Sequence, residues 1–194
     1  ETISFLSYTQ DIGKLFTLSV SPGVSLLNYN LNHGETQRFW TFRTNTWLQY
    51  NLNSHHQFVI GFAIGNEQAD ISYLNTASQA VDSLQTRRGN PYLDNPKIHD
   101  YFFNYRAQIN SLGIQFNATY TKYLHNISYI YSVEDGRLVS SYQSDDSYHK
   151  LRLEGLCSYR ISDNLRANTT LRYEHMNVPQ HSQLKEDNFF ASID

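Results

Sequence analysis

Histidines, a cysteine and acidic pairs are the side chains of this chain that could hold a metal. The sequence contains eight histidines and one cysteine. His55 and His56 are adjacent in a polar segment, and the other histidines are scattered without the HExxH or paired CxxC spacing of zinc sites. Cys157 has no second cysteine with which to form an internal disulfide. We therefore expect no metal site and no disulfide framework.

The same residues give little support for catalysis. Cys157 has no base and orienting residue identifiable beside it, so it is expected to fill space on a strand. Asp145 and Asp146 are expected to keep a loop solvated, and the sequence has no glycine-rich phosphate loop and no GxSxG element. Lys and Arg number 15 against 18 Asp and Glu, which gives no reason to expect nucleic acid as a partner. We predict a protein that is not an enzyme and has no cofactor.

Four residues in the longest irregular segment, at about 66–97, are candidates for ligand binding. Arg87 and Arg88 could meet an anionic ligand, and Tyr92 could stack on a sugar or peptide group near Asn90. The alternative is that the arginines keep the loop solvated while Asn90-Pro91 defines a turn, because proline presets one backbone angle and restricts the preceding residue. Loops of this length are uncommon in compact domains unless they are functional or disordered.

The strands that would position this loop are visible as alternation. Between Arg38 and Gly65, large apolar residues recur at every second position on both sides of the polar segment 51–56, which is the period of a β-strand. Trp40 and Tyr50 bracket the first apolar face and are about ten residues apart, roughly the span of a tilted membrane strand with interfacial aromatics. These two residues are therefore predicted at the two membrane interfaces.

Similar alternation predicts about eight strands over a single unit of residues 1–194, with a strand core at about 14–175. A kink is expected at Pro22-Gly23, because proline cannot donate to a ladder. Three further expectations concern local interruptions: residues 9–14 form a turn, residues 138–146 make a short excursion and not a full strand, and the pattern fades beyond Met176. Glu1 leads directly into strand-like sequence, so no signal peptide is expected.

The order of the connections favours a membrane barrel. Short turns after Tyr8, Tyr50, Ile109 and Ile161 alternate with longer polar connections after Leu31, Ile64 and Tyr131, as in an up-and-down barrel with short periplasmic turns. The fold class predicted is all-β, an antiparallel meander that forms part of a transmembrane β-barrel. The second faces of the strands are polar, and the residues predicted to face the lumen are Arg43, Asn45, Arg106, Arg152 and Arg172. A solvated outer face of a soluble β-rich domain would explain the same charges.

Several short elements make the chain similar to a known family. Gly89-Asn90-Pro91-Tyr92-Leu93 with Pro96 nearby precedes a tyrosine-rich strand, a turn, and a strand that leads to Asp135-Gly136 and Ser140-Ser141-Tyr142. This order resembles the barrel of TonB-dependent outer-membrane receptors of Bacteroidetes-type bacteria, over residues from about 16 to 175. The resemblance implies a bacterial outer-membrane location, contact with outer-membrane lipid, and uptake of a nutrient ligand that the sequence does not identify.

Family members are much longer than this chain, which leaves its extent open. In them a plug domain, which engages the TonB energising system, occludes a barrel of about 22 strands. No plug is visible here, and the ending Phe189-Phe190-Ala191-Ser192-Ile193-Asp194 lacks the terminal aromatic of related barrels. The expectation is an interior segment of a transporter barrel. The alternatives are a complete small eight-stranded barrel and a soluble β-rich binding or structural domain.

Overall fold

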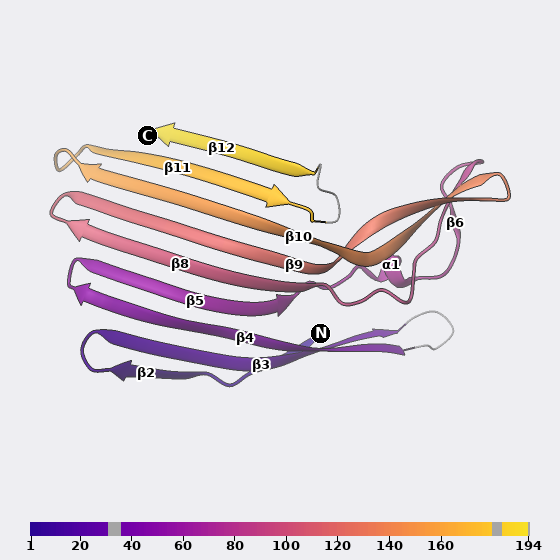
Figure 1. Cartoon of the computed structure of the whole chain (residues 1–194), viewed down its shortest axis with the longest axis horizontal. Coiled ribbons are helices and arrows are strands. Elements are labelled where there is room, and N and C mark those ends of the chain that lie inside the picture. Colours follow the sequence, from indigo (N-terminus) through magenta and orange to yellow (C-terminus); the bar gives the residue numbers. More distant parts are fainter. Residues whose placement is uncertain (31–35, 180–183, 194) are drawn as a thin grey trace.

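The computed structural model describes residues 1–30, 36–179 and 184–193, without the side chains of Asp145 and Asp146. The described strands form one twelve-stranded sheet whose main path runs β1-β3-β4-β5-β8-β9-β10-β11-β12, each strand antiparallel to its neighbours (Figure 1). The all-β antiparallel meander predicted from the sequence is confirmed. No described helix is long and apolar enough to cross a membrane.

The eight predicted strands correspond to eight strands of the main path. They are β1 (Thr2–Phe5), β3 (Phe16–Asn30), β4 (Thr36–Asn53), β5 (His56–Asn66), β8 (Lys97–Ile109), β9 (Leu112–Glu134), β10 (Arg137–Arg160) and β11 (Arg166–Asn177). Four more strands are β2 (Tyr8–Ile12), β6 (Gln79–Ala80), β7 (Gln85–Arg87) and β12 (Lys185–Ile193), and the one described helix is α1 (Ile71–Leu74). Within the described residues β12 pairs with β11 alone, so the sheet is open and is not the closed small barrel considered above.

The turn predicted at residues 9–14 is wrong over residues 9–12, because β2 occupies Tyr8–Ile12, and the chain turns only at residues 13–15. β1 and β2 pair with β3 in one continuous register, and the ladder breaks only at Leu6 and Ser7, opposite Pro22 and Ser21. Proline has no N–H to donate, so this rung keeps a single main-chain bond, in which Leu6 N–H donates to the Pro22 carbonyl at 2.9 Å. The expected kink therefore appears as a gap in the edge strand, while β3 stays paired to β4 through Pro22 and Gly23.

The short excursion predicted at residues 138–146 is also wrong. Arg137–Arg160 is one strand of 24 residues, β10, which turns back from β9 through Asp135 and Gly136. Both turn residues have positive φ (49° and 76°), as a tight hairpin turn requires. The β9–β10 register shifts on either side of Asp146, which interrupted the sequence period, and the hairpin projects beyond the other strands (Figure 1).

The strand core also extends beyond the predicted limit near residue 175. β12 pairs with β11 from Asn177↔Lys185 to Thr169↔Ile193. The short turns between β2 and β3, β4 and β5, β8 and β9, and β10 and β11 lie at one end of the sheet, and the long connection between β5 and β8 lies at the other (Figure 1). The longer connection predicted after Tyr131 is wrong, because the two-residue turn Asp135-Gly136 joins β9 to β10. The polar loop predicted at 32–36 falls almost entirely outside the described residues.

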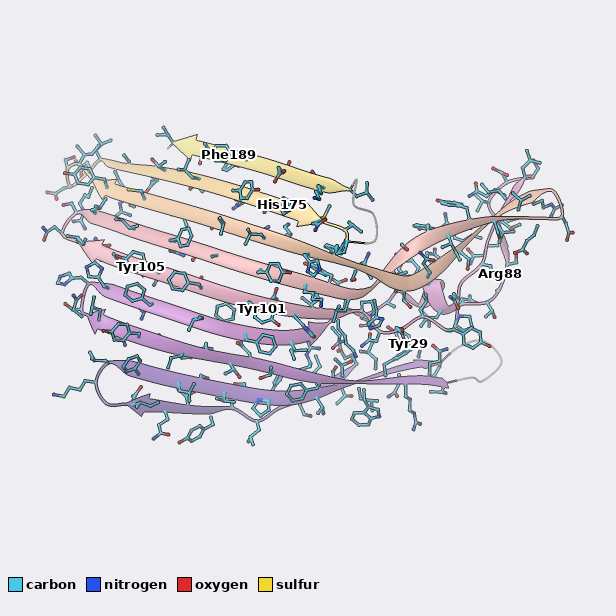
Figure 2. All side chains as sticks on the ribbon, viewed as in Figure 1. Tyr29, Arg88, Tyr101, Tyr105, His175 and Phe189 are labelled. Carbon is cyan, nitrogen blue, oxygen red and sulfur yellow. The ribbon has the colours of Figure 1, made fainter. Side chains whose placement is uncertain are left out.

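The two faces of the sheet differ, because successive side chains of a strand point to opposite sides. One face, called the aromatic face here, carries a row of rings: Tyr50 stacks on Phe16 at 4.7 Å, and Phe58 stacks on Tyr105 at 4.8 Å between ring centroids. Tyr101 and Tyr105 both occupy odd positions of β8, so both lie on this face (Figure 2). Trp40 is on the same face and is 68% exposed. The opposite face is called the polar face.

Candidate functional site

The long connection between β5 and β8 is folded onto its neighbours by a small apolar core. Leu27 and Tyr29 of β3 are buried together with Leu74 of α1, Leu93 and Tyr142 of β10. The Tyr29 hydroxyl donates to the Ala69 carbonyl at 2.9 Å (Figure 2 labels Tyr29 at this end of the sheet). Desolvation of the phenol, followed by its hydrogen bond with Tyr129, raises the pKa of Tyr142 to about 12. The connection therefore has a defined conformation, with α1, β6 and β7 inside the segment predicted as irregular.

Gly89 and Asn90 hold the two halves of this connection together. Gly89 N–H donates to the Asn75 carbonyl at 2.8 Å and Asn90 N–H to the Tyr73 carbonyl at 2.7 Å. A Cβ on Gly89 would lie 2.3 Å from the Asn75 carbonyl oxygen, so a side chain there would displace the backbone. The Asn90 amide also donates to the Tyr142 carbonyl at 2.9 Å. The structure thus favours the turn-forming role for Asn90, one of the two roles that the sequence left open.

The connection reaches from β10 to β4. On the β10 side, β7 pairs in parallel with Leu138–Ser140, and Asp94 N–H donates to the Ser144 hydroxyl at 2.9 Å. On the β4 side, the buried Asn95 amide donates to the Thr41 hydroxyl at 2.9 Å, and the Gln37 amide donates to the Pro91 carbonyl. Thr41 is two residues from Arg43 and shares its side of β4, so the connection rests on the polar face. We call the segment 67–96 the loop shelf.

The four ligand-binding candidates of the loop lie in two places: Arg87 and Arg88 lie beside the β9–β10 hairpin, and Asn90 and Tyr92 contact each other. Arg87 lies in β7 opposite Ser140, and Arg88 reaches the tip of the projecting hairpin, where it pairs with Glu134 at 3.2 Å with both side chains 48% exposed (Figure 2). Tyr92 N–H donates to the Asn90 side chain at 2.9 Å, and the Tyr92 side chain is 90% exposed. Arg87, Arg88 and Tyr92 are therefore at the surface of the loop shelf, whereas Asn90 is engaged within it.

The five residues predicted for the lumen share the polar face. Following the register from Asn45 across Ala63, Asp100 and Thr121 leads to Lys150 in β10, and residues opposite one another lie on the same side. By alternation along the strands, the same side carries Arg43, Arg106, Arg152 and Arg172. Trp40 and Tyr50, at even positions of β4, lie on the other side. The residues predicted to face the lumen and the two aromatics predicted at the membrane interfaces thus lie on opposite faces of the sheet.

Ion pairs connect β10 and β11 on the polar face. Arg152 Nε lies 2.6 Å from Glu174 Oε1, and Lys150 Nζ lies 3.1 Å from Glu174 Oε2. One rung nearer the short turns, Arg172 Nη2 lies 2.6 Å from Glu154 Oε2. The alternation in the sequence predicts Arg152 and Arg172 on one face but not the pairing of these charges, because the pairing depends on the register of two strands. We call these five residues the charged ladder.

Arg43 is the hub of a second polar group near the loop shelf. Its Nη1 donates to Asn66 Oδ1 at 2.8 Å and lies 3.1 Å from Glu1 Oε1, while its Nε is buried without a hydrogen-bond partner in the described structure. Ser25, fully buried, donates to the same Asn66 oxygen at 2.8 Å. No group of three His, Cys, Asp or Glu residues in the described part of the chain could hold a metal ion.

The open sheet, its aromatic face and its polar face define a segment of a β-barrel wall. The chain belongs to the outer membrane protein β-barrel family, whose profile matches residues 23–194. It is a protein of the bacterial outer membrane. The family match confirms the predicted resemblance to outer-membrane receptor barrels. A soluble β-rich domain is therefore the wrong alternative.

Two solved structures share the fold. The FrpB iron transporter from Neisseria meningitidis (F3-3 variant) superposes with a TM-score of 0.69 at 10% identity, over 91% of this chain and 25% of that chain. The copper transporter OprC superposes with a TM-score of 0.72 at 12% identity, over 99% of this chain and 33% of that chain. The chain thus spans a quarter to a third of these transporters. A search of curated proteins found no match.

Proposed function

We propose that this chain forms part of the wall of a larger outer-membrane barrel that takes up a nutrient with energy delivered through TonB. The observation that carries the proposal is the charged ladder on the polar face, directly behind an aromatic face of the kind that meets lipid. The open edges of the sheet support a larger barrel, because an unpaired edge in a membrane must find further strands.

In this arrangement each set of residues has a distinct role. Arg43, Asn45, Arg106, Arg152 and Arg172 line the water-filled interior, where charges stay solvated. Trp40 and Tyr50 lie at the two lipid interfaces of β4. Arg87, Arg88 and Tyr92 contact the ligand at the surface of the loop shelf. Asn90 stabilises the conformation of the loop shelf and does not contact the ligand. The mechanism is capture and passage, not a chemical reaction, and a plug outside the described residues would open the path.

The transported substance is a nutrient of unidentified class. FrpB is described as an iron transporter and OprC as a copper transporter, but identities of 10–12% support the shared fold and not a shared ligand. The exposed arginines of the loop shelf favour an anionic nutrient or nutrient complex, because a guanidinium binds carboxylate and phosphate through paired N–H groups.

The orientation of the two faces can be tested with a fluorophore on single cysteines. In a Cys157→Ser background, Ile60→Cys places the probe on the aromatic face, where Ile60 is 59% exposed. Asn45→Cys, on the same pair of strands, is the matched control on the polar face. Lipids that carry a quencher in their acyl chains should quench the probe at position 60 strongly and the probe at 45 weakly. The reverse order would contradict the proposed orientation.

Uptake itself can be tested in the bacterium that makes the protein. We expect deletion of the gene to slow growth on one limiting nutrient of a panel, and removal of TonB to produce the same defect. Restoring the gene should restore growth only while TonB is present. Growth equal to that of the parent strain on the whole panel would refute the proposed uptake, whatever the outcome of the quenching experiment.

A further inference from the structure

Basic side chains form a row on the aromatic face at the loop end of the sheet. Lys122 in β9 lies directly opposite His99 in β8 on one side and His149 in β10 on the other. Neighbouring strands are about 4.8 Å apart, so the three side chains lie within about 10 Å. The row continues through Asn177 in β11 to Lys185 in β12. Basic residues thus stand at the same rung on four of five adjacent strands.

Ring contacts place this row on the aromatic face. The Tyr120 hydroxyl and His149 Nδ1 are 2.7 Å apart and their rings stack at 5.7 Å. His99 makes an edge contact with Phe62, whose ring also contacts Tyr101. Figure 2 shows Tyr101 on β8 nearer to this end of the sheet than Tyr105. The tyrosines therefore occupy the rung just below the basic row, on the side of the short turns.

In the proposed orientation, the row lies at the level where the strands pass from the hydrocarbon core of the membrane into the headgroup region. His99, Lys122 and His149 are each about ten residues along their strands from the short turns, and a tilted strand crosses a bilayer in about this length. A row of tyrosines under a row of basic residues matches the order of an interface, where phenol rings reach headgroup level and cations meet anionic groups. Below this rung the same face carries apolar residues on these strands, including Phe103, Ala118 and Leu153.

Lys122 is available for an external anion. Among the described side chains it has no ion-pair partner, whereas Lys150, on the polar face of the next strand, is paired with Glu174. The carboxylate of Asp187, the nearest described acid on the aromatic face of β12, is already bound by Tyr173 at 2.6 Å and His175 at 2.8 Å. A lysine flanked by two imidazoles offers N–H donors from three strands to one compact anion.

We propose that His99, Lys122 and His149 bind the phosphate group of an anionic membrane lipid at the outer surface of the barrel. The site holds lipid against β8, β9 and β10, on the face of the sheet opposite the one on which the loop shelf rests. The assignment rests on the proposed orientation of the faces, and it adds a defined lipid site that the uptake function does not require.

The test measures lipid binding to the protein extracted from outer membranes in a non-ionic detergent. Delipidated protein is titrated with phosphatidylglycerol and bound lipids are counted by native mass spectrometry, with phosphatidylcholine as the zwitterionic comparator. Each positive charge near a headgroup contributes about a fivefold increase in binding. We expect Lys122→Gln to weaken phosphatidylglycerol binding about fivefold, and the triple variant with His99→Gln and His149→Gln to weaken it further. Phosphatidylcholine binding should not change.

Lys150→Gln is the matched control, because it removes the same charge from the opposite face of β10, at the residue next to His149. Loss of binding in Lys150→Gln and not in Lys122→Gln would overturn both this site and the proposed orientation. Equal binding in all variants would overturn the site alone. If inorganic phosphate displaces the lipid at low millimolar concentration, the site takes free phosphate and the lipid assignment fails. Circular dichroism of each variant verifies that the strands are intact.

Discussion

Replacing Asn90 with Ala should release the loop shelf without unfolding the sheet. The Asn90 side chain donates to the Tyr142 carbonyl at 2.9 Å and accepts from Tyr92 N–H at 2.9 Å. Each hydrogen bond contributes about 0.5–1.5 kcal/mol net, so the loss is about 1–3 kcal/mol. Such a change speeds amide exchange by about 5- to 150-fold in a segment that opens locally. The protected amides of Gly89 and Asn90 report this opening directly.

The assay is hydrogen–deuterium exchange on the detergent-solubilised protein, compared with two matched variants. Asn90→Asp keeps an acceptor for Tyr92 N–H but loses the donor to Tyr142, so its effect should be intermediate. Tyr92→Ala removes a side chain that is 90% exposed and should leave exchange unchanged. Exchange in Asn90→Ala equal to the wild type, or acceleration as large in Tyr92→Ala, would refute the structural role assigned to Asn90.

Three further changes test the shelf and the wall. Leu74→Ala removes a fully buried side chain of the shelf core and should cost about 2–5 kcal/mol, measured as faster limited proteolysis within residues 67–96. The Ser72 backbone and side-chain hydrogen bonds lower the pKa of Asp70 below its ordinary 3.8. Protection of the Ser72 amide, corrected for intrinsic exchange, should therefore be complete above this value and fall as the pH drops through the lowered pKa. Gly61→Val should displace Phe102, whose ring lies 2.2 Å from where a Cβ would be, and lower the thermal unfolding temperature.

Each of these predictions has a control in the same part of the chain. Leu84→Ala changes a side chain that is 68% exposed and should not alter proteolysis. Asp70→Asn keeps the acceptor without titrating, so its Ser72 protection should not depend on pH; a persisting dependence would assign the titration to another group. Gly155→Val has open space at its Cβ and should be tolerated, and equal destabilisation at both glycines would contradict the packing argument.

The strands could be predicted from sequence because alternation is a property of a single segment. In β4, Trp40, Phe42, Leu48 and Tyr50 share the even positions and Arg43, Asn45 and Gln49 the odd ones, and this separation follows from the pleat of one strand. The prediction failed where partners distant in the chain decide. The 138–146 stretch reads as irregular since the register shifts around Asp146, and β2 was missed because its residues resemble a turn until β3 pairs with them.

The loop shelf had only a weak signal in the sequence. Leu74 and Leu93 are apolar residues within a long polar connection, and their burial against Leu27, Tyr29 and Tyr142 joins positions far apart in the chain. Asn90 and Tyr92, two residues apart, seemed equivalent ligand candidates. Their surroundings, one engaged with β10 and the other exposed, depend on how the connection folds back on the sheet.

The sequence by itself determined the kind of protein: the alternating faces of the strands and the short turns between them indicate the wall of an outer-membrane β-barrel. These features are local, so they survive without knowledge of any contact. Only the tertiary structure decided which charges pair across β10 and β11, how the connection after β5 becomes a shelf, and that His99, Lys122 and His149 meet in one row. The reason is physical: register and docking arise from contacts between distant segments, and a strand's period of two is compatible with many registers.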